Sequence, residues 1–479
     1  MAINRRRFLK DSALAFGGVM MSPTLLRNAM AQGSDFSGKT VITLFLRGGA
    51  DGLQSIFPTG PTVEPSQIEA YKFLRNANDG SNNLLGFIPS IERTGAPGEI
   101  EPLQLNDYFE MHPALANLLP AYTDGKLAIL PAVGNAGSRS HFQAEDGIEA
   151  GTPFVVNGMK TNGWMHDALD QLLLDDPANL NSRLTGGISF GSSVATSLQG
   201  TAQAGSIVAM RSIDGFNLNI AGEQRTVLSD IYSLHLNDFG RFKQSGSSVL
   251  SIADNVNLLQ SDYAATLQNS FSNTSAMDLG FAKNLASITT LIKNGNAPAF
   301  CNVNVGGGWD THNNEWPRLN GLFSKLASGI NEFYLALSPA ELDNVCLVVL
   351  SEFGRTLDVN GNLGADHGNG GTWFVLGGTV DGGKVFADQW PGLPLPEKDE
   401  NGNIVYAAEN IPKYQADITG GFTNSLTLAG KRPIMTPGTD FRSVYRSVLE
   451  DFVGLSDITT ALNLSPQELV DIPKLGLFG

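Results

Sequence analysis

Cysteine is almost missing from this chain of 479 residues, which carries only Cys301 and Cys346. Both lie in apolar runs that are predicted to be strands, so we interpret them as buried free thiols. A disulfide stays possible if the two strands are neighbours. Beyond the N-terminal segment, no run of consecutive apolar residues is long enough to span a bilayer. The sequence therefore predicts no disulfide framework and no stable membrane span.

Positive charge is also scarce. The chain has 31 Lys and Arg against 47 Asp and Glu, and its net charge is −16. A phosphate backbone is bound by basic surfaces, so this balance argues against nucleic acid as a partner. A small anionic substrate held by a few local arginines remains compatible with it.

Basic residues do gather at the N-terminus, where residues 4–10 are Asn-Arg-Arg-Arg-Phe-Leu-Lys. This segment resembles a twin-arginine export signal. A modest apolar stretch over residues 12–26 and an Ala-Met-Ala cleavage site at residues 29–31 follow it. We therefore expect residues 1–31 to be a signal peptide, the twin-arginine translocase to be a partner during export, and the mature chain to be periplasmic or secreted. The alternative is a basic amphipathic helix.

Continuous apolar runs predict a mainly parallel sheet, because strands buried on both faces lack the polar alternation of exposed sheets. The predicted strands lie at residues 40–46, 127–133, 299–305, 345–350 and 372–376. Helical periodicity marks residues 113–122, 163–174, 316–337 and 441–452. Strands that alternate with helices are typical of a doubly wound α/β fold.

The domain organisation is predicted to be simple. We expect one domain over residues 32–479. Its residues 182–295 are expected to form a mainly helical insertion or cap beside the sheet, because helical periodicity dominates from about residue 224 to residue 293. The helix at 316–337 joins two predicted strands into a βαβ unit, whose crossover is expected to be right-handed.

The most informative segment follows the strand at 299–305. Three glycines and a tryptophan precede Asp310 and His312. Asp and His are common ligands of zinc and related metals, and glycines permit sharp turns. The C-terminal ends of strands are also where α/β proteins build their sites. We predict a pair of metal ligands here, and the simpler alternative is a hydrogen-bonded pair in a loop.

Other predicted strands are also flanked by polar side chains in glycine-rich turns. Asp51 follows the first strand, Glu352 and Arg355 follow the strand at 345–350, and His367 lies between glycines before the strand at 372–376. Asp51 could be an ordinary turn residue, and Glu352 could simply pair with Arg355. Alternatively, the carboxylates could bind metal and Arg355 could hold an oxyanion.

The segment from Ser138 to His141 precedes a predicted helix. Either Ser138 or Ser140 could cap this helix, which is the commoner role of such a serine. A helix N-terminus can also bind an anion or activate a nucleophile. A nucleophilic serine is possible because Arg139 and His141 lie beside it.

Taken together, these motifs resemble the alkaline phosphatase superfamily. More narrowly, they resemble the uncharacterised sulfatase-like family of bacterial proteins exported by the twin-arginine pathway. The narrower resemblance runs from residues 46–52 to residues 439–445, nearly the whole mature chain. It implies an alkaline phosphatase-like fold, a nucleophile at Ser138 or Ser140, and metal ligands at Asp51, Asp310, His312 and His367.

The chain also departs from the superfamily pattern. The Asp-His pair that usually ends the next strand is replaced by Glu352 and Phe353, which puts one of two metal positions in doubt. Asp310 and His312 are closer together than the superfamily usually places them. The Cys-x-Pro-x-Arg motif of arylsulfatases is absent, so a standard sulfatase is not expected.

We expect a periplasmic metal-dependent hydrolase of a phosphate or sulfate ester, acting on a small anionic substrate or a surface polymer. One metal position would comprise Asp310, His312 and His367, and a second would comprise Asp51 and Glu352. Zinc or manganese is favoured, with one or two ions per chain. The catalytic candidates are Ser138, Arg139, Ser140, His141 and Arg355.

Two other functions are compatible with the sequence. A non-catalytic binding or assembly module on a degenerate version of the fold is favoured by Phe353. A mononuclear iron oxygenase could use Asp310, His312 and His367, although such triads usually occur in all-β barrels.

Overall fold

The computed structural model describes residues 38–65, 102–201, 207–216, 222–233, 252–273, 276–357, 362–390 and 437–479, with a few isolated positions between these ranges. The expected signal peptide at residues 1–31 lies outside the described residues. Within them, no helix combines the length and apolar character needed to cross a membrane.

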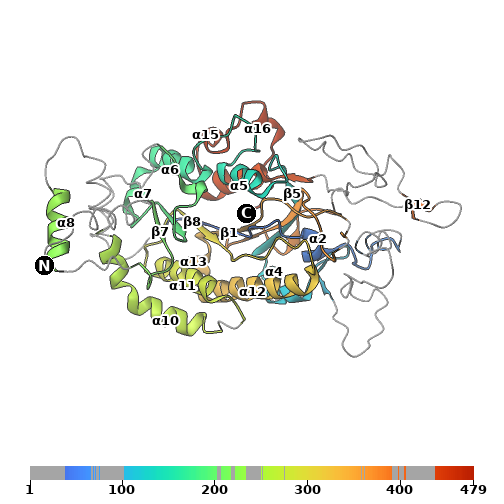
Figure 1. The fold of residues 1–479 in the computed structure, drawn as a ribbon, viewed down its shortest axis with the longest axis horizontal. Coiled ribbons are helices and arrows are strands. Elements are labelled where there is room, and N and C mark those ends of the chain that lie inside the picture. Colours follow the sequence, from blue (N-terminus) through green and yellow to red (C-terminus); the bar gives the residue numbers. More distant parts are fainter. Residues whose placement is uncertain are drawn as a thin grey trace.

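A mixed sheet of nine strands forms the centre of the described structure (Figure 1). Its strands are β1 (Thr40–Phe45), β5 (Leu127–Gly134), β6 (Gly187–Phe190), β7 (Ile207–Met210), β8 (Phe300–Asn304), β9 (Val345–Leu350), β10 (Gly371–Leu376), β11 (Lys384–Val385) and β14 (Thr439–Asp440). The order is β11-β5-β10-β9-β1-β8-β6-β7, and β14 also pairs with β5.

All strand pairs are parallel except those of β10, which runs antiparallel to both β5 and β9. The ends of β1, β8 and β9 are level, because Phe45 lies opposite both Asn304 and Leu350. The antiparallel β10 therefore begins at the same edge where its parallel neighbours end. This edge collects the loops that carry most of the predicted site residues.

Helices cover both faces of the sheet (Figure 1). One face packs against η2 (Pro113–Leu118), α4 (Leu119–Thr123), α10 (Gln260–Ser270), α11 (Leu279–Lys293) and α12 (Glu315–Ala336). The other face packs against α5 (His141–Ala150), α6 (Trp164–Asp175), α14 (Phe441–Ser447), the π-helical turn η5 (Val448–Val453) and α15 (Thr459–Leu462). The three-layer arrangement confirms the predicted mainly parallel α/β class.

Short elements complete the described structure. They are α2 (Gly52–Ser55), β2 (Ile56–Phe57), β3 (Leu103–Gln104), β4 (Glu110–Met111), α7 (Pro177–Ser182), η3 (Thr196–Leu198), α8 (Glu223–Ser233), α13 (Pro339–Leu342), β12 (Glu397–Lys398), β13 (Ile404–Val405) and α16 (Glu468–Asp471).

The segment 182–295 supplies more than helices. Its strands β6 and β7 extend the central sheet beyond β8, and its helices α10 and α11 pack on the face that α12 also covers. Strands β6 and β7 and helices α10 and α11 of this segment therefore belong to the main architecture at one end of the sheet.

The two cysteines are free and fully buried, as the sequence predicted. Cys301 on β8 and Cys346 on β9 are separated by β1, and their side chains enter the cores on opposite faces of the sheet. Burial raises the pKa of both thiols. This placement leaves them as inert core residues.

Candidate metal centre

Three loops at the shared sheet edge bring three imidazoles around one carboxylate. Asp310 and His312 follow β8, His141 begins α5 after β5, and His367 precedes β10. Oδ1 of Asp310 lies 3.1 Å from Nε2 of His312 and 3.5 Å from Nε2 of His367, and Oδ2 lies 3.4 Å from Nε2 of His141. The three Nε2 atoms thus converge on a single side chain.

The opposite nitrogen of each ring is held by an acceptor. Nδ1 of His312 lies 3.0 Å from the Asp366 carboxylate, and Nδ1 of His141 lies 2.7 Å from the Glu352 carboxylate. Nδ1 of His367 lies 2.7 Å from the backbone carbonyl oxygen of Arg139. These acceptors favour the ring proton at each Nδ1, and in the neutral imidazole that tautomer leaves Nε2 able to bind a cation.

The spacing of two of the rings and the carboxylate is compatible with a cation. Nε2 of His312 and Nε2 of His367 are 2.9 Å apart, a separation at which the two nitrogens can share a proton or a bound cation. Two donor atoms that each bind one zinc ion at about 2.0–2.1 Å are themselves about 3.0–3.4 Å apart. The distances among His312, His367 and Asp310 are close to this range, so these residues could hold a divalent ion.

His141 supplies an independent indication. Its Nε2 is buried and makes no hydrogen bond, although Oδ2 of Asp310 lies 3.4 Å away. A buried polar atom without a partner costs free energy, typically about 1–3 kcal/mol. Together His141, Asp310 and His367 form a group whose ligand atoms lie within 4.8 Å of one another. A bound ion would satisfy the nitrogen.

The pKa values of two residues in the cluster favour the binding of a cation. Burial, together with the nearby Arg355 guanidinium, lowers the pKa of His367 to about 4, so its imidazole is neutral at pH 7. Burial opposes ionisation of Asp310, but the hydrogen bond and charge of Arg355 and the charges that His312 and His141 carry when protonated hold the pKa of this carboxyl below its ordinary value. The hydrogen bond with Glu352 raises the pKa of His141.

Glu352, predicted as a metal ligand, contacts His141 and belongs to a second group of possible ligands that does not include Asp310. Its side chain is fully buried. Oε1 accepts from the Gly48 amide at 2.8 Å and contacts Nδ1 of His141, and Oε2 accepts from the Ser351 hydroxyl at 3.1 Å. A carboxylate that orients a ligating histidine is a common outer-shell arrangement.

A second metal position is poorly supported. His141, Glu145 and Glu352 also have ligand atoms within 4.8 Å of one another. Glu145, however, forms an ion pair with Arg47, which also binds Glu149 at 3.0 Å. Phe353 stacks on the rings of His141 and His367, with centroids 5.0 Å and 4.8 Å away. It covers these rings where the superfamily pattern would place another ligand.

The loop that carries His367 is fixed by a short antiparallel contact with the segment after β9. Arg355 and His367 form a β-bridge, and the Gly354 amide donates to the Asn369 carbonyl oxygen at 2.9 Å. The two backbones approach so closely that a Cβ on Gly354 would lie 1.9 Å from the Gly370 carbonyl oxygen. Glycine is required at this position.

Arg355, predicted to hold an oxyanion, lies among backbone carbonyl oxygens beside Asp310. Its buried guanidinium donates to the carbonyl oxygens of Gly49 at 2.7 Å, Ala365 at 3.1 Å and Trp309 at 3.1 Å, and also to that of Gly48. It further donates to Asp310 at 2.7 Å. These contacts join three loops and orient Asp310.

Asp51 also lies outside the metal cluster. Both of its oxygens pair with the fully buried Arg75, at 2.6 Å and 3.1 Å, and Oδ1 accepts from the Leu53 amide as the N-cap of α2. The buried carboxyl of Glu315 belongs to the same charged group and is hydrogen-bonded by Thr311 at 2.8 Å. The predicted first-strand ligand is therefore one half of a buried ion pair.

The two candidate serines are distinguished by their contacts. The Ser138 hydroxyl donates to Gln143 at 2.7 Å and accepts from the Ser140 amide at 3.1 Å, so it is used within the turn. Ser140 is the exposed N-cap residue of α5, and its side chain makes no capping bond. Arg139 is half-buried and donates to the carbonyl oxygen of His367 at 3.1 Å.

Sequence reasoning missed two features of this centre. His141 was expected as a catalytic residue, whereas its Nε2 joins the ligand atoms. Asp366 was not singled out, although it accepts from both His312 and Asn360 at 3.0 Å. Its position next to His367 in a glycine-rich turn was the available signal.

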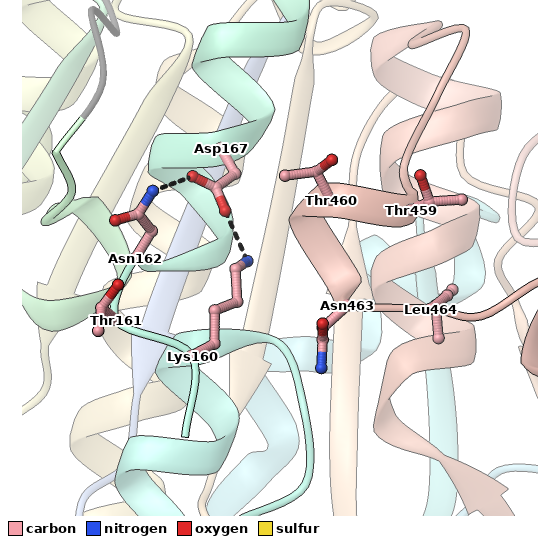
Figure 2. Close-up of a pocket in the computed structure, with 8 residues that line it drawn as sticks. All are labelled: Lys160, Thr161, Asn162, Asp167, Thr459, Thr460, Asn463 and Leu464. Carbon is pink, nitrogen blue, oxygen red and sulfur yellow. Dashed lines mark hydrogen bonds and ion pairs between the residues drawn. The ribbon is translucent and has the colours of Figure 1, made fainter. Parts of the chain in front are cut away.

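A cleft of about 390 Å³ lies elsewhere, between the start of α6 and α15 (Figure 2). Lys160 donates to Asp167 at 2.8 Å and to the Ala461 carbonyl oxygen at 2.7 Å, and Asn162 donates to Asp167 at 2.8 Å. The Lys160 and Asn162 side chains point toward Asp167 (Figure 2). The charged groups of Lys160 and Asp167 are therefore paired with each other within the cleft. The Asp167 carboxylate also contacts Nδ1 of His166.

Comparisons with known proteins identify the family of this chain. No curated protein and no solved structure matches the chain. One family model matches residues 109–393, which is more than half of the chain and includes His141, Asp310, His312, Glu352 and His367. The chain therefore belongs to the family described as "Protein of unknown function (DUF1501)".

Proposed function

We propose that this protein is an exported, metal-dependent hydrolase of a phosphate or sulfate ester, built on an alkaline phosphatase-like version of the α/β fold. The observation that carries the proposal is the convergence of three imidazole Nε2 atoms on Asp310, each with its Nδ1 fixed by an acceptor. A donor set of three nitrogens and one carboxylate suits zinc, and manganese remains compatible with it. The twin-arginine motif supports export into the periplasm.

A bound divalent ion would supply Lewis acidity to an ester oxygen. The chain's own residues would do the remaining work. Glu352, Asp366 and the Arg139 carbonyl group hold the three imidazoles, and Arg355 holds Asp310. Ser140 is the favoured nucleophile, because its exposed hydroxyl lies at the start of α5 and that of Ser138 is used within the turn.

Electrostatics also favour an anionic ester at this position. The N-terminal end of α5 carries the partial positive charge of the helix dipole, which attracts oxyanions. Arg139 precedes this helix and is partly exposed. We expect Arg139 to interact with the non-bridging oxygens of the substrate.

A non-catalytic binding or assembly module is the second candidate. Phe353 favours it, because the phenyl ring covers His141 and His367 where the superfamily pattern would place a ligand. An iron oxygenase is less well supported, since the third imidazole, that of His141, adds to the proposed triad of Asp310, His312 and His367.

The test uses the exported full chain, loaded with zinc or manganese and assayed against panels of phosphate and sulfate esters. Asp310→Ala should abolish hydrolysis, Ser140→Ala should reduce it strongly, and Ser138→Ala should reduce it only modestly. Unchanged hydrolysis in Asp310→Ala would contradict the mechanism. A metal-loaded protein that hydrolyses no ester in either panel would favour the non-catalytic module.

A further inference from the structure

Three exposed apolar residues lie in the two segments that flank the start of α5. Phe142 follows His141 directly in α5, and its side chain is 83 % exposed. Val155 and Val156 are also exposed, at 56 % and 67 %. We call these three residues the apolar rim.

The rim is held near the centre by backbone contacts. The amide of Phe154 donates to the carbonyl oxygen of Ala136 at 2.8 Å, and a Cβ on Gly137 would lie 2.6 Å from the Phe154 backbone. Residues 155 and 156 therefore start from the turn that leads into Ser138 and His141. Two segments that lie apart in sequence thus present apolar groups at the start of α5.

Exposing a phenyl ring and two branched side chains to water costs free energy. Large exposed apolar groups that cluster beside a polar site commonly mark a binding surface. Phe142 follows the candidate ligand His141 in α5, so the Cα atoms of the two residues are about 3.8 Å apart. Consecutive side chains of a helix point about 100° apart, so an apolar group would have to extend from the ester oxygen along the start of α5 to contact the ring.

We propose that the substrate is amphiphilic, an anionic ester whose alcohol part carries an apolar group that packs on Phe142, Val155 and Val156. This inference rests on the proposed function, because it assigns the anionic part of the same molecule to the metal centre. The N-terminal end of α5 favours the charged part, and the rim favours the apolar part. Phe142 is then a specificity-determining residue.

The test measures binding of two non-hydrolysable probes, phenylphosphonate and methylphosphonate, to the metal-loaded full chain by calorimetry. The wild-type protein should bind phenylphosphonate roughly three- to tenfold more tightly, as an aromatic contact of this kind provides. Phe142→Ser should remove most of this preference and leave the affinity for methylphosphonate unchanged. Leu174→Ser is the matched control, because Leu174 on α6 is 76 % exposed and lies outside the rim.

Four results are informative. If Phe142→Ser loses the preference for phenylphosphonate while Leu174→Ser keeps it, and the metal content is unchanged, the proposed contact between the apolar rim and the substrate is supported. Two results would contradict the proposed contact between the apolar rim and the substrate and leave the proposed function intact. One is equal affinity of the wild-type protein for the two probes, and the other is a preference for phenylphosphonate that persists in Phe142→Ser. If neither probe binds the metal-loaded protein, the proposed function fails and the substrate assignment fails with it.

Discussion

At the scale of single residues, the site depends on groups that hold the ligands. Glu352 fixes His141, and Asp366 fixes His312. These carboxylates set which nitrogen carries the proton, so each Nε2 presents a lone pair. A centre described only by its three imidazoles and Asp310 would omit the reason that they point inward.

Glu352→Gln should therefore weaken metal binding. The amide nearly preserves the shape of the side chain but removes the negative charge beside His141. Losses of outer-shell partners typically cost about 10- to 100-fold in metal affinity, and we expect a loss in that range by competition with a chelator. Asp262→Asn, which changes an exposed carboxylate on α10, is the control and should have no effect. If Glu352→Gln and Asp262→Asn bound the metal with equal affinity, Glu352 would have no role in holding the metal ligands.

Arg355→Lys separates a positioning role from substrate binding. A lysine cannot replace the fork of donors that reaches Gly49, Ala365, Trp309 and Asp310. We expect a loss of at least about 2 kcal/mol in the free energy of unfolding, because buried carbonyl oxygens lose their partners. Denaturant unfolding measures this loss. A variant of normal stability whose only defect is a raised KM would instead support the oxyanion clamp.

At the scale of elements, the parallel strands explain how distant segments meet. β1, β8 and β9 end at one edge, and the antiparallel β10 begins there. His367 reaches this edge through the close backbone contact between residues 354–356 and 366–369. The contact depends on the absence of a side chain at Gly354.

Gly354→Ala should disrupt both the fold and the metal centre. The added Cβ would lie 1.9 Å from the Gly370 carbonyl oxygen, so one backbone must move and carry His367 with it. We expect a lower melting temperature and reduced metal content. Gly307→Ala is the matched control, because a Cβ there meets nothing within 4 Å. Normal metal binding by Gly354→Ala would show that the contact does not position His367.

The buried carboxyl of Glu315 at the start of α12 should make stability depend on pH. Burial, together with the nearby Asp51 charge, raises the pKa of Glu315 well above its ordinary value. The folded state therefore holds this proton more tightly than the unfolded state, and the contribution of Glu315 to stability falls as pH rises between the unfolded and the folded pKa.

Glu315→Gln should remove this dependence, because an amide does not titrate. As the pH rises from 5 to 8, the melting temperature of the variant should increase relative to that of the wild-type protein. The difference between the two proteins should be smallest at pH 5. Thermal unfolding across this range measures the effect. A parallel pH dependence in the two proteins would show that Glu315 does not titrate as described.

The elements predicted from sequence include β1, β5, β8, β9 and β10, because each is a continuous apolar run with clear turn signals on either side. Asp310, His312 and His367 were predicted as ligands from their glycine-rich turns, and the structure brings them together. The pairing of Asp51 with Arg75 could not be predicted, because no local pattern shows which distant side chain meets a buried carboxylate. The same holds for Arg355, whose acceptors come from three loops.

At the scale of the whole molecule, a bound ion should stabilise the fold globally. The candidate ligands come from loops after β5 and β8 and before β10, so unfolding would disperse them. A ligand that binds only the folded state at 100 times its Kd adds about 2.7 kcal/mol. We expect a chelator to lower the melting temperature of the wild-type protein and to leave that of His312→Ala unchanged.

The most direct test of the central claim, that His141, His312, His367 and Asp310 bind one ion, is elemental mass spectrometry of the purified exported protein beside His312→Ala. The account predicts about one zinc or manganese ion per chain in the wild-type protein and a large loss in the variant. No metal in the wild-type protein after reconstitution, or equal metal in both proteins, would contradict it.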